Sequence, residues 1–216
     1  MTFRGWPAEA LEFFEGLEAD NSRAWWVAHR DVYDRAVRGP MDELLAELAA
    51  DYGPGKVFRP NRDMRFSADK SPYKTNIGAM VGEVAYVQVD VHGLGAGRGM
   101  YVMAADQLDR YRRAVDDGTT GPALEAVVGE LARAGIEVTG HGSLKTAPRG
   151  YPKDHPRVAL LRHKGLIAWK QWPPAAWLGT KAAKARIVGF IEAAAPLDRW
   201  LAEHVGPSTL PPDERR

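Results

Sequence analysis

The segment Val84–His92 alternates apolar and polar residues, and this pattern constrains the fold more than any other feature of the sequence. Ala85, Val87, Val89 and Val91 fall on one face of a strand, because successive side chains point to opposite sides of a sheet. The glycine-rich run Gly93–Gly99 follows, and we expect it to form a flexible hairpin loop that leads into a second strand at Met100–Ala104.

Helical patterns lie on both sides of this strand-rich centre, with apolar residues recurring at helical spacing before residue 53 and after residue 105. Further short strands are predicted near Val57, near Met64–Ser67, at Ile136–Thr139 and at Leu166–Trp172. Strands that cluster in the middle, with helices before and after them, predict an α+β fold with a central, mainly antiparallel sheet flanked by helices. The simplest account is a single domain over residues 1–207, with a flexible tail over residues 208–216.

Proline, glycine and polar residues set the predicted helix ends. We expect Gly39-Pro40 to end one helix and Gly121-Pro122 to interrupt another pattern. Asp106 is a candidate cap for the helix through Tyr111, and Pro196 is expected to begin the last helix. The neighbours Trp25 and Trp26 cannot share one helix face, so one is expected in the core. The other either packs under a loop or lines a pocket, and a core position is preferred for both.

Composition excludes several classes of function. The charges nearly cancel, with 29 Lys and Arg against 28 Asp and Glu, so no global field would draw the chain to nucleic acid or to a membrane. The chain has no cysteine, which excludes disulfides, a thiolate nucleophile and Cys-ligated metals. No apolar run approaches the roughly 20 residues that span a bilayer. We predict a soluble, cytoplasmic protein without a membrane partner.

The segment Val57–Asn76 combines charge with aromatic residues in a way that fits no simple amphipathic element. Its cations are Arg59, Arg62, Arg65, Lys70 and Lys74, its acids are Asp63 and Asp69, and its aromatic residues are Phe58, Phe66 and Tyr73. A guanidinium presents a planar fork of donors that matches phosphate or carboxylate, and lysine adds a point charge. The segment therefore predicts an anion pocket. The alternative is an internal salt-bridge network in which the two acids pin the loop to the sheet.

A second loop, Pro148–Pro156, contains Arg149, Tyr151, Lys153 and His155. It either supplies more anion contacts or forms a rigid connection whose charges are solvated, and both interpretations stay open. The candidate groups for proton transfer are Tyr73, Asp63 and His155.

Other known sites fit the sequence poorly. A nuclease-like metal site can be assembled from Asp63, Asp69, Lys70, Glu83 and Asp90, but such residues are common, and no metal ligand is predicted. Gln88, Asp90 and His92 share a strand face, for which a solvated face is preferred over acid–base chemistry. The run GLGAGRG is not a dinucleotide fingerprint, because its sixth position is Arg98. No cofactor is indicated.

The run FRPNRDMRFSADKSPYKTNIG resembles the signature of a bacterial family, the domain of unknown function 2461. Three further blocks resemble the family in the same order: FFEGLEADNSRAWWVAHRDVYD, GRGMYVMAADQLDRYRRAV and LKTAPRGYPKDHPRVALLRHKGL. The family has no established activity, so the resemblance implies no catalytic residue. The matching positions that rank highest are Arg62, Asp63, Arg65, Lys70, Tyr73 and Lys74, then Arg149, Gly150, Tyr151 and His155. Ala104 and Trp26 depart from the family pattern, outside the charged run.

These observations favour a small-molecule anion-binding protein, either a sensor or an enzyme acting on a phosphorylated or carboxylated substrate. One alternative is a nucleic-acid-binding module that uses the same cations with aromatic stacking, or a metal-dependent nuclease-like enzyme. The other is a non-catalytic interaction or structural protein. The sequence predicts no oligomeric state.

Overall fold

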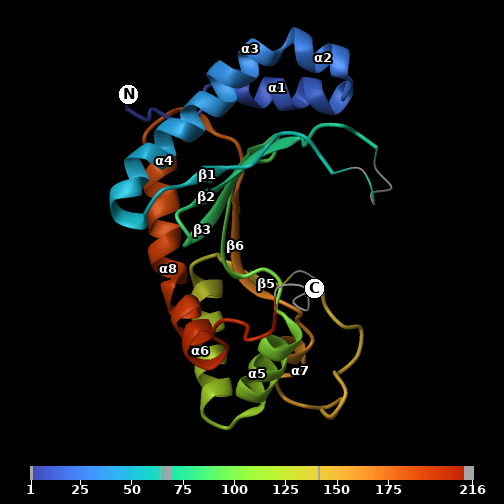
Figure 1. Ribbon diagram of the computed structural model, residues 1–216. Helices are drawn as coiled ribbons and strands as arrows, with labels where there is room; N and C mark the ends of the chain where they lie inside the picture. The colour runs from blue at the N-terminus through green and yellow to red at the C-terminus, as the bar shows by residue number, and fades with distance from the viewer. Residues whose placement is uncertain (1, 64, 66–69, 141, 212–216) are drawn as a thin grey trace. The chain divides into compact units, whose positions relative to one another are not determined.

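The computed structural model describes residues 2–63, 65, 70–140 and 142–211 (Figure 1). Its strands form a six-stranded antiparallel sheet in the order β1-β2-β3-β4-β6-β5. The strands are β1 (Lys56–Val57), β2 (Asn76–Val81), β3 (Ala85–Asp90), β4 (Gly93–Met100), β5 (Glu137–Thr139) and β6 (Leu166–Trp172). The fold is α+β with an antiparallel sheet, as predicted.

Helices precede and follow the strands along the chain. They are α1 (Ala8–Ala19), α2 (Arg23–Ala28), α3 (Arg30–Val32), the π-helix η1 (Tyr33–Arg38), α4 (Gly39–Tyr52), α5 (Ala105–Asp116), α6 (Thr120–Arg133), α7 (Val158–Leu161), the 3-10 helix η2 (Ala176–Gly179) and α8 (Ala182–His204).

The chain divides into two compact units. Unit 1 comprises Met1–Ala96 and Gln171–Phe190, and unit 2 comprises Gly97–Lys170 and Ile191–Arg216. The elements β4, β6 and α8 contribute residues to both units. The predicted boundary at residue 207 stays a prediction.

The core of unit 1 follows the alternation seen in the sequence. The odd-numbered residues of β2 and β3, from Ile77 to Val89, are buried, and the even-numbered residues other than Gly78 are only partly buried. Helix α4 packs on β1 and β2 and buries Leu44, Leu45 and Leu48 (Figure 1). One face of the sheet is thus apolar and covered by helices, and the other face carries the polar side chains.

The prediction of a loop at Gly93–Gly99 is wrong, because this run forms most of the buried strand β4. The turn at Val91–His92 joins β3 to β4, and β4 ends at Met100, so Met100–Ala104 is not a strand. The glycines are explained by close packing, since a Cβ on Gly97 would lie 3.0 Å from the Trp169 ring. Because glycine has no side chain, a strand rich in glycine does not show the apolar–polar alternation by which a strand is recognised in a sequence.

Several predicted helix ends are also wrong. Gly39-Pro40 does not end a helix, because α4 continues directly from η1. The Gly39 N–H donates to Asp34 O in the π register, and Pro40 lies in the first turn of α4. Gly121-Pro122 likewise lies in the first turn of α6. Pro196 lies inside α8 instead of beginning a new helix. The helix α2 is capped by Ser22, whose side chain accepts a hydrogen bond from the Trp25 amide.

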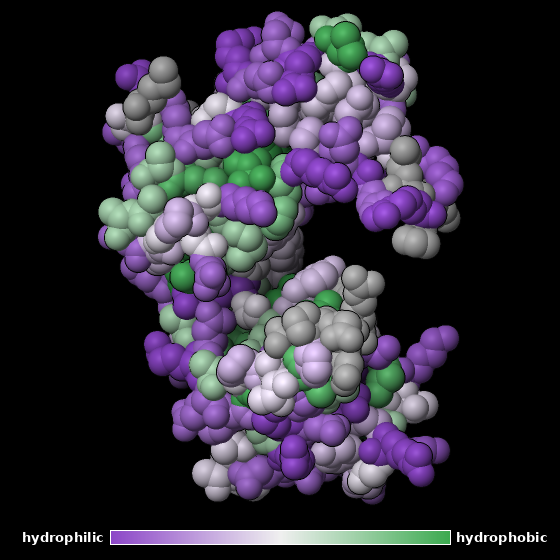
Figure 2. All heavy atoms as spheres, viewed as in Figure 1, coloured by the Kyte–Doolittle hydropathy of each residue, from purple (hydrophilic) through white to green (hydrophobic). Residues whose placement is uncertain are grey.

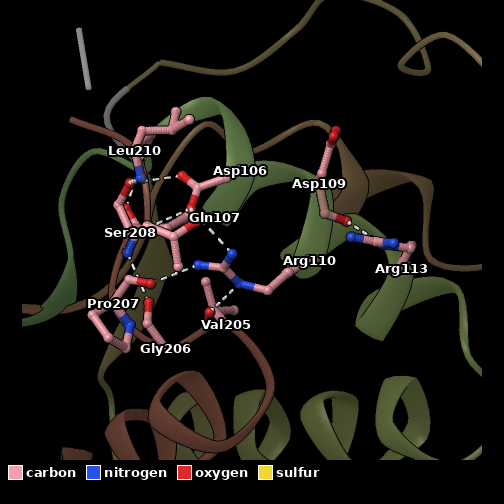
Figure 3. Close-up of polar contacts among 12 residues, drawn as sticks. Asp106, Gln107, Asp109, Arg110, Arg113, Val205, Gly206, Pro207, Ser208 and Leu210 are labelled. Atoms are coloured by element: carbon pink, nitrogen blue, oxygen red, sulfur yellow. Dashed lines mark hydrogen bonds and ion pairs between the residues drawn. The ribbon is translucent and has the colours of Figure 1, made fainter. Parts of the chain in front are cut away.

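Asp106 does not cap α5, whose preceding residue is Ala104. With Gln107 and Arg110 it instead binds residues 205–209, which follow α8 (Figure 3). The donors on α5 bind three consecutive carbonyls: Arg110 Nε with Val205 O at 2.5 Å, Gln107 Nε2 with Gly206 O at 2.8 Å and Arg110 Nη2 with Pro207 O at 2.7 Å. These side chains and residues 205–209, named here the C-terminal clasp, satisfy carbonyls beyond the helix end.

Helix α5 also contributes an acceptor to the clasp, Asp106, which accepts from the Ser208 hydroxyl and the Thr209 amide, each at 2.8 Å. Desolvation raises the pKa of Asp106, but the hydrogen bonds from Thr209, Ser208 and Arg110 together lower it well below its ordinary value of 3.8. The folded state thus holds this proton more weakly than the unfolded chain does. The stabilisation from Asp106 is therefore complete well above pH ~4 and is lost as the pH falls through the lowered pKa.

We predict that Asp106→Asn is less stable than the parent at pH 7 and that this difference shrinks near pH 3. Urea unfolding of both proteins at the two pH values measures it, because the carboxylates common to both cancel in the comparison. An unchanged difference would show that the charge of Asp106 does not hold the clasp.

Candidate functional site

The basic segment continues the β1–β2 hairpin beyond the sheet. Asn61 pairs with Tyr73 in an antiparallel bridge, with the Arg62 N–H donating to Pro72 O at 2.9 Å and the Lys74 N–H donating to Pro60 O at 2.8 Å. We name residues 58–75 the basic hairpin. The strand predicted near Met64–Ser67 falls largely on residues 64, 66 and 67, and it lies outside the described residues together with Asp69.

Tyr73 fixes the base of the basic hairpin to the helices. Its ring stacks on Trp26 of α2, with ring centroids 4.3 Å apart and planes 8° apart, and only 7% of the residue is exposed. The Asn21 side chain binds both backbone groups of Tyr73, accepting from its N–H at 3.0 Å and donating to its C=O at 3.1 Å. Tyr73 thus serves as an anchor, and its predicted role in proton transfer stays a prediction.

The strand period places the other side chains. Tyr73 faces the helices, and its bridge partner Asn61 shares that side of the hairpin. The strand period therefore directs Arg62 and Lys74 to the opposite side. The same parity continues into β2 and β3, where Asn76 is opposite Asp90 and Met80 is opposite Tyr86. We name this side of unit 1 the polar face. Its members are Phe58, Arg62, Lys74, Asn76, Tyr86, Gln88 and Asp90.

A chain of hydrogen bonds crosses the polar face. Gln88 Nε2 donates to Asp90 Oδ2 at 3.0 Å, and the Tyr86 hydroxyl donates to Gln88 Oε1 at 3.0 Å. Asn76 Nδ2 donates to both the Tyr86 hydroxyl (3.2 Å) and Gln88 Oε1 (3.1 Å). Since an ionised carboxylate only accepts, Asp90 fixes the orientation of the Gln88 amide and so the direction of the whole chain.

Gly78 makes this chain possible. A Cβ at Gly78 would lie 2.4 Å from the Tyr86 hydroxyl oxygen and 2.9 Å from ring carbons of Tyr86. The tyrosine, opposite Met80 in the register, lies across the glycine and so reaches Asn76. The absence of a side chain at Gly78 is therefore a requirement of the site, whereas in the sequence it only weakens the strand pattern of β2.

Lys74 lies among like charges on the polar face. Burial, together with the nearby Arg59 and Arg62, lowers the pKa of Lys74 below its ordinary value. Its ammonium nitrogen lies 5.7 Å from the centre of the Phe58 ring, within the range of a cation–π contact. Figure 2 shows hydrophilic side chains gathered over the basic hairpin. The pairing of the hairpin thus brings positive charge together next to an aromatic ring.

Arg65 and Asp63 form a bidentate ion pair at 2.9 and 2.6 Å. The side chains are 76% and 44% exposed, and such exposed pairs contribute little to stability. The hydrogen bonds from Arg65 lower the pKa of Asp63, so Asp63 is ionised at neutral pH. Arg59 and Lys70 are exposed as well. The sequence left open a salt-bridge network that pins the loop to the sheet. This pair does not support such a network, because both of its residues belong to the loop itself.

The second predicted loop, Pro148–Pro156, belongs to unit 2, whereas the basic hairpin belongs to unit 1. His155 is buried, and its Nδ1 accepts from the Arg157 N–H at 3.0 Å, so its Nε2 carries the proton and donates to Asp116 at 3.0 Å. The Nε2 bond therefore holds the loop against α5, and the Nδ1 bond lies within the loop's own backbone. Burial, and then Asp116, raises the pKa of Tyr151, and Arg149 is exposed.

Sequence reasoning missed part of the polar face. It placed Gln88 and Asp90 on one face of the predicted strand, a face that Tyr86 shares by the same alternation, but it did not find β2 or the partner Asn76. The signal that could have indicated this partner is the polar residue Asn76 at the end of the charged run. His92, which was grouped with Gln88 and Asp90, lies in the β3–β4 turn and donates its backbone N–H to Asp90.

Within the described residues, no group of three or more His, Asp or Glu side chains is arranged to hold a metal ion. The same part of the chain contains no helix that is both long and apolar enough to cross a bilayer.

The fold and the polar face define an α+β protein with an open antiparallel sheet and a cationic hairpin beside its polar side. Residues 9–200 match the family described as conserved hypothetical protein (DUF2461), and the chain belongs to this family. Neither the curated proteins nor the solved structures contain a match to the chain.

Proposed function

We propose that this protein binds a small phosphorylated or carboxylated molecule at the polar face. The observation that carries the proposal is the hairpin pairing that brings Lys74 and Arg62 to one side, next to Phe58. A phosphate or carboxylate accepts charge-assisted hydrogen bonds from such groups. A small anionic ligand and a chain without cysteine both fit the cytoplasm, which we propose as its compartment.

The electrostatics of Lys74 support an external partner. Its pKa is lowered, so its surroundings within the described residues disfavour the charged ammonium. A bound anion would reverse this by placing negative charge between Lys74 and its neighbouring arginines. The opposite is expected of a lysine held in an internal ion pair, whose pKa is raised by its acidic partner.

We predict that Lys74→Gln weakens binding of the anion about 10- to 100-fold, because a hydrogen bond to a charged group contributes ~1.5–3 kcal/mol. A thermal-shift screen with inorganic phosphate, sugar phosphates, nucleotides and carboxylates measures this. A ligand at 100 times its Kd adds ~2.7 kcal/mol, or roughly 5–10 °C at ~2–4 °C per kcal/mol for a protein of this size.

The exposed Lys181→Gln is the matched control, since it removes the same charge from unit 1 away from the polar face. Without ligand, Lys74→Gln should melt close to the parent temperature, because burial and the nearby arginines disfavour the ammonium while its contact with Phe58 favours it. A large loss of melting temperature in Lys74→Gln, with no ligand shift in the parent, would overturn the proposal and favour a structural role for the cations.

A further inference from the structure

We infer that the anion is carried by a molecule with a planar ring, and that this ring stacks on Phe58. This inference rests on the proposed function and names the chemical class of its ligand, an aromatic phosphate such as a nucleoside monophosphate.

The first support is the exposure of Phe58. The residue is 37% exposed, although burying an apolar ring away from water is favourable. Its backbone is fixed, because its N–H donates to Gly78 O at 2.9 Å. The strand parity that buries the odd-numbered residues directs Phe58 to the polar face. An apolar ring is thus held in place among polar groups.

The neighbours of Phe58 suit a ring that carries a negative charge. Lys74 Nζ lies 5.7 Å from the centre of the Phe58 ring, and the Tyr86 ring lies 6.1 Å away at 35°. A ligand ring stacked on Phe58 would have its anionic substituent near Lys74 and Arg62. Stacking of a nucleic-acid base on an aromatic side chain tolerates any base, because every base has a π-face.

The hydrogen-bond chain across the polar face indicates that the site does not distinguish one base from another. Asn76 Nδ2 donates both of its hydrogens and Gln88 Oε1 accepts two bonds inside the chain. Gln88 also donates to Asp90. These amides are largely committed to one another, so they offer little for reading the edge of a base. The expected selectivity is for a ring joined to an anion, with small differences between one ring and another.

Isothermal titration calorimetry with inorganic phosphate, ribose 5-phosphate, AMP and UMP tests this on the parent and on Phe58→Leu. We expect AMP and UMP to bind the parent about 5- to 150-fold more tightly than ribose 5-phosphate, the ratio that one stacked base supplies. Phe58→Leu should lose this advantage and keep its affinity for ribose 5-phosphate. Tyr101→Leu, which alters an exposed aromatic residue of unit 2, should behave as the parent.

The outcomes separate the two proposals. Equal affinities for ribose 5-phosphate, AMP and UMP, all weakened by Lys74→Gln, would overturn the inference of a ring stacked on Phe58. The proposed anion-binding function would then still hold. No binding of any of these ligands would overturn the ring, and the wider screen of anions would then decide the proposed function. A single-stranded oligonucleotide that binds far more tightly than AMP, with an affinity that falls steeply with salt, would overturn the ring-bearing small molecule in favour of nucleic acid.

Discussion

Replacing Trp26 with alanine is expected to lower the free energy of unfolding by about 3–5 kcal/mol. Trp26 is 5% exposed and packs its ring against Tyr73, Tyr33 and Phe13, with centroids 4.3, 4.8 and 5.8 Å away. Removing the indole leaves a cavity among three aromatic rings that are fixed by separate elements, so the site cannot easily collapse. Urea unfolding followed by far-UV circular dichroism measures the loss.

The adjacent Trp25→Ala is the matched control for this prediction. Trp25 is only partly buried and stacks on His29, with ring centroids 4.0 Å apart. We expect it to lose about 1–2 kcal/mol. Equal losses for the two variants would contradict the assignment of Trp26 as the anchor of Tyr73. Since Tyr73 holds the basic hairpin, Trp26→Ala should also weaken anion binding under conditions where it stays folded.

Gly82→Ala is expected to cost about 2–5 kcal/mol, for two separate reasons. Gly82 has a φ of 54°, a left-handed conformation that costs other residues about 1–2 kcal/mol. A Cβ there would lie 1.8 Å from Tyr52 O, at the end of α4, so backbone must move, and such overpacking costs about 1–3 kcal/mol. The turn between β2 and β3 and the end of α4 would have to separate. Urea unfolding again provides the measurement.

The control is Gly189→Ala, in the part of α8 that belongs to unit 1. A Cβ at Gly189 would meet no atom within 4 Å, and alanine favours a helix over glycine by about 0.5–1 kcal/mol. Its effect should therefore have the opposite sign. A Gly82→Ala variant as stable as the parent would show that α4 does not pack closely against this turn.

The elements that could be predicted from the sequence are those whose pattern is local. The strand β3 and the helices α1 and α4 were found because their apolar residues recur with the period of a strand or a helix. The strand β6 was predicted with its observed limits, Leu166–Trp172. The charged run Val57–Asn76 could be singled out from its composition alone, and the family match covers it.

Tertiary structure alone decided which of these residues act together. The glycines of β4 are strand residues because Trp169, distant in the sequence, packs against Gly97, and no local pattern records that contact. Pro196 lies within α8, although a proline inside a helix lacks an N–H donor and its ring clashes with the preceding turn. The sequence alone could not predict this position. The polar face exists because the β2–β3 register sets Asn76 opposite Asp90 and lets Tyr86 lie across Gly78. The sequence by itself determined that cations are concentrated in residues 57–76. Long-range strand pairing determined that Lys74 and Arg62 share one side with Phe58, because side-chain direction depends on register and a shift of one residue would reverse it.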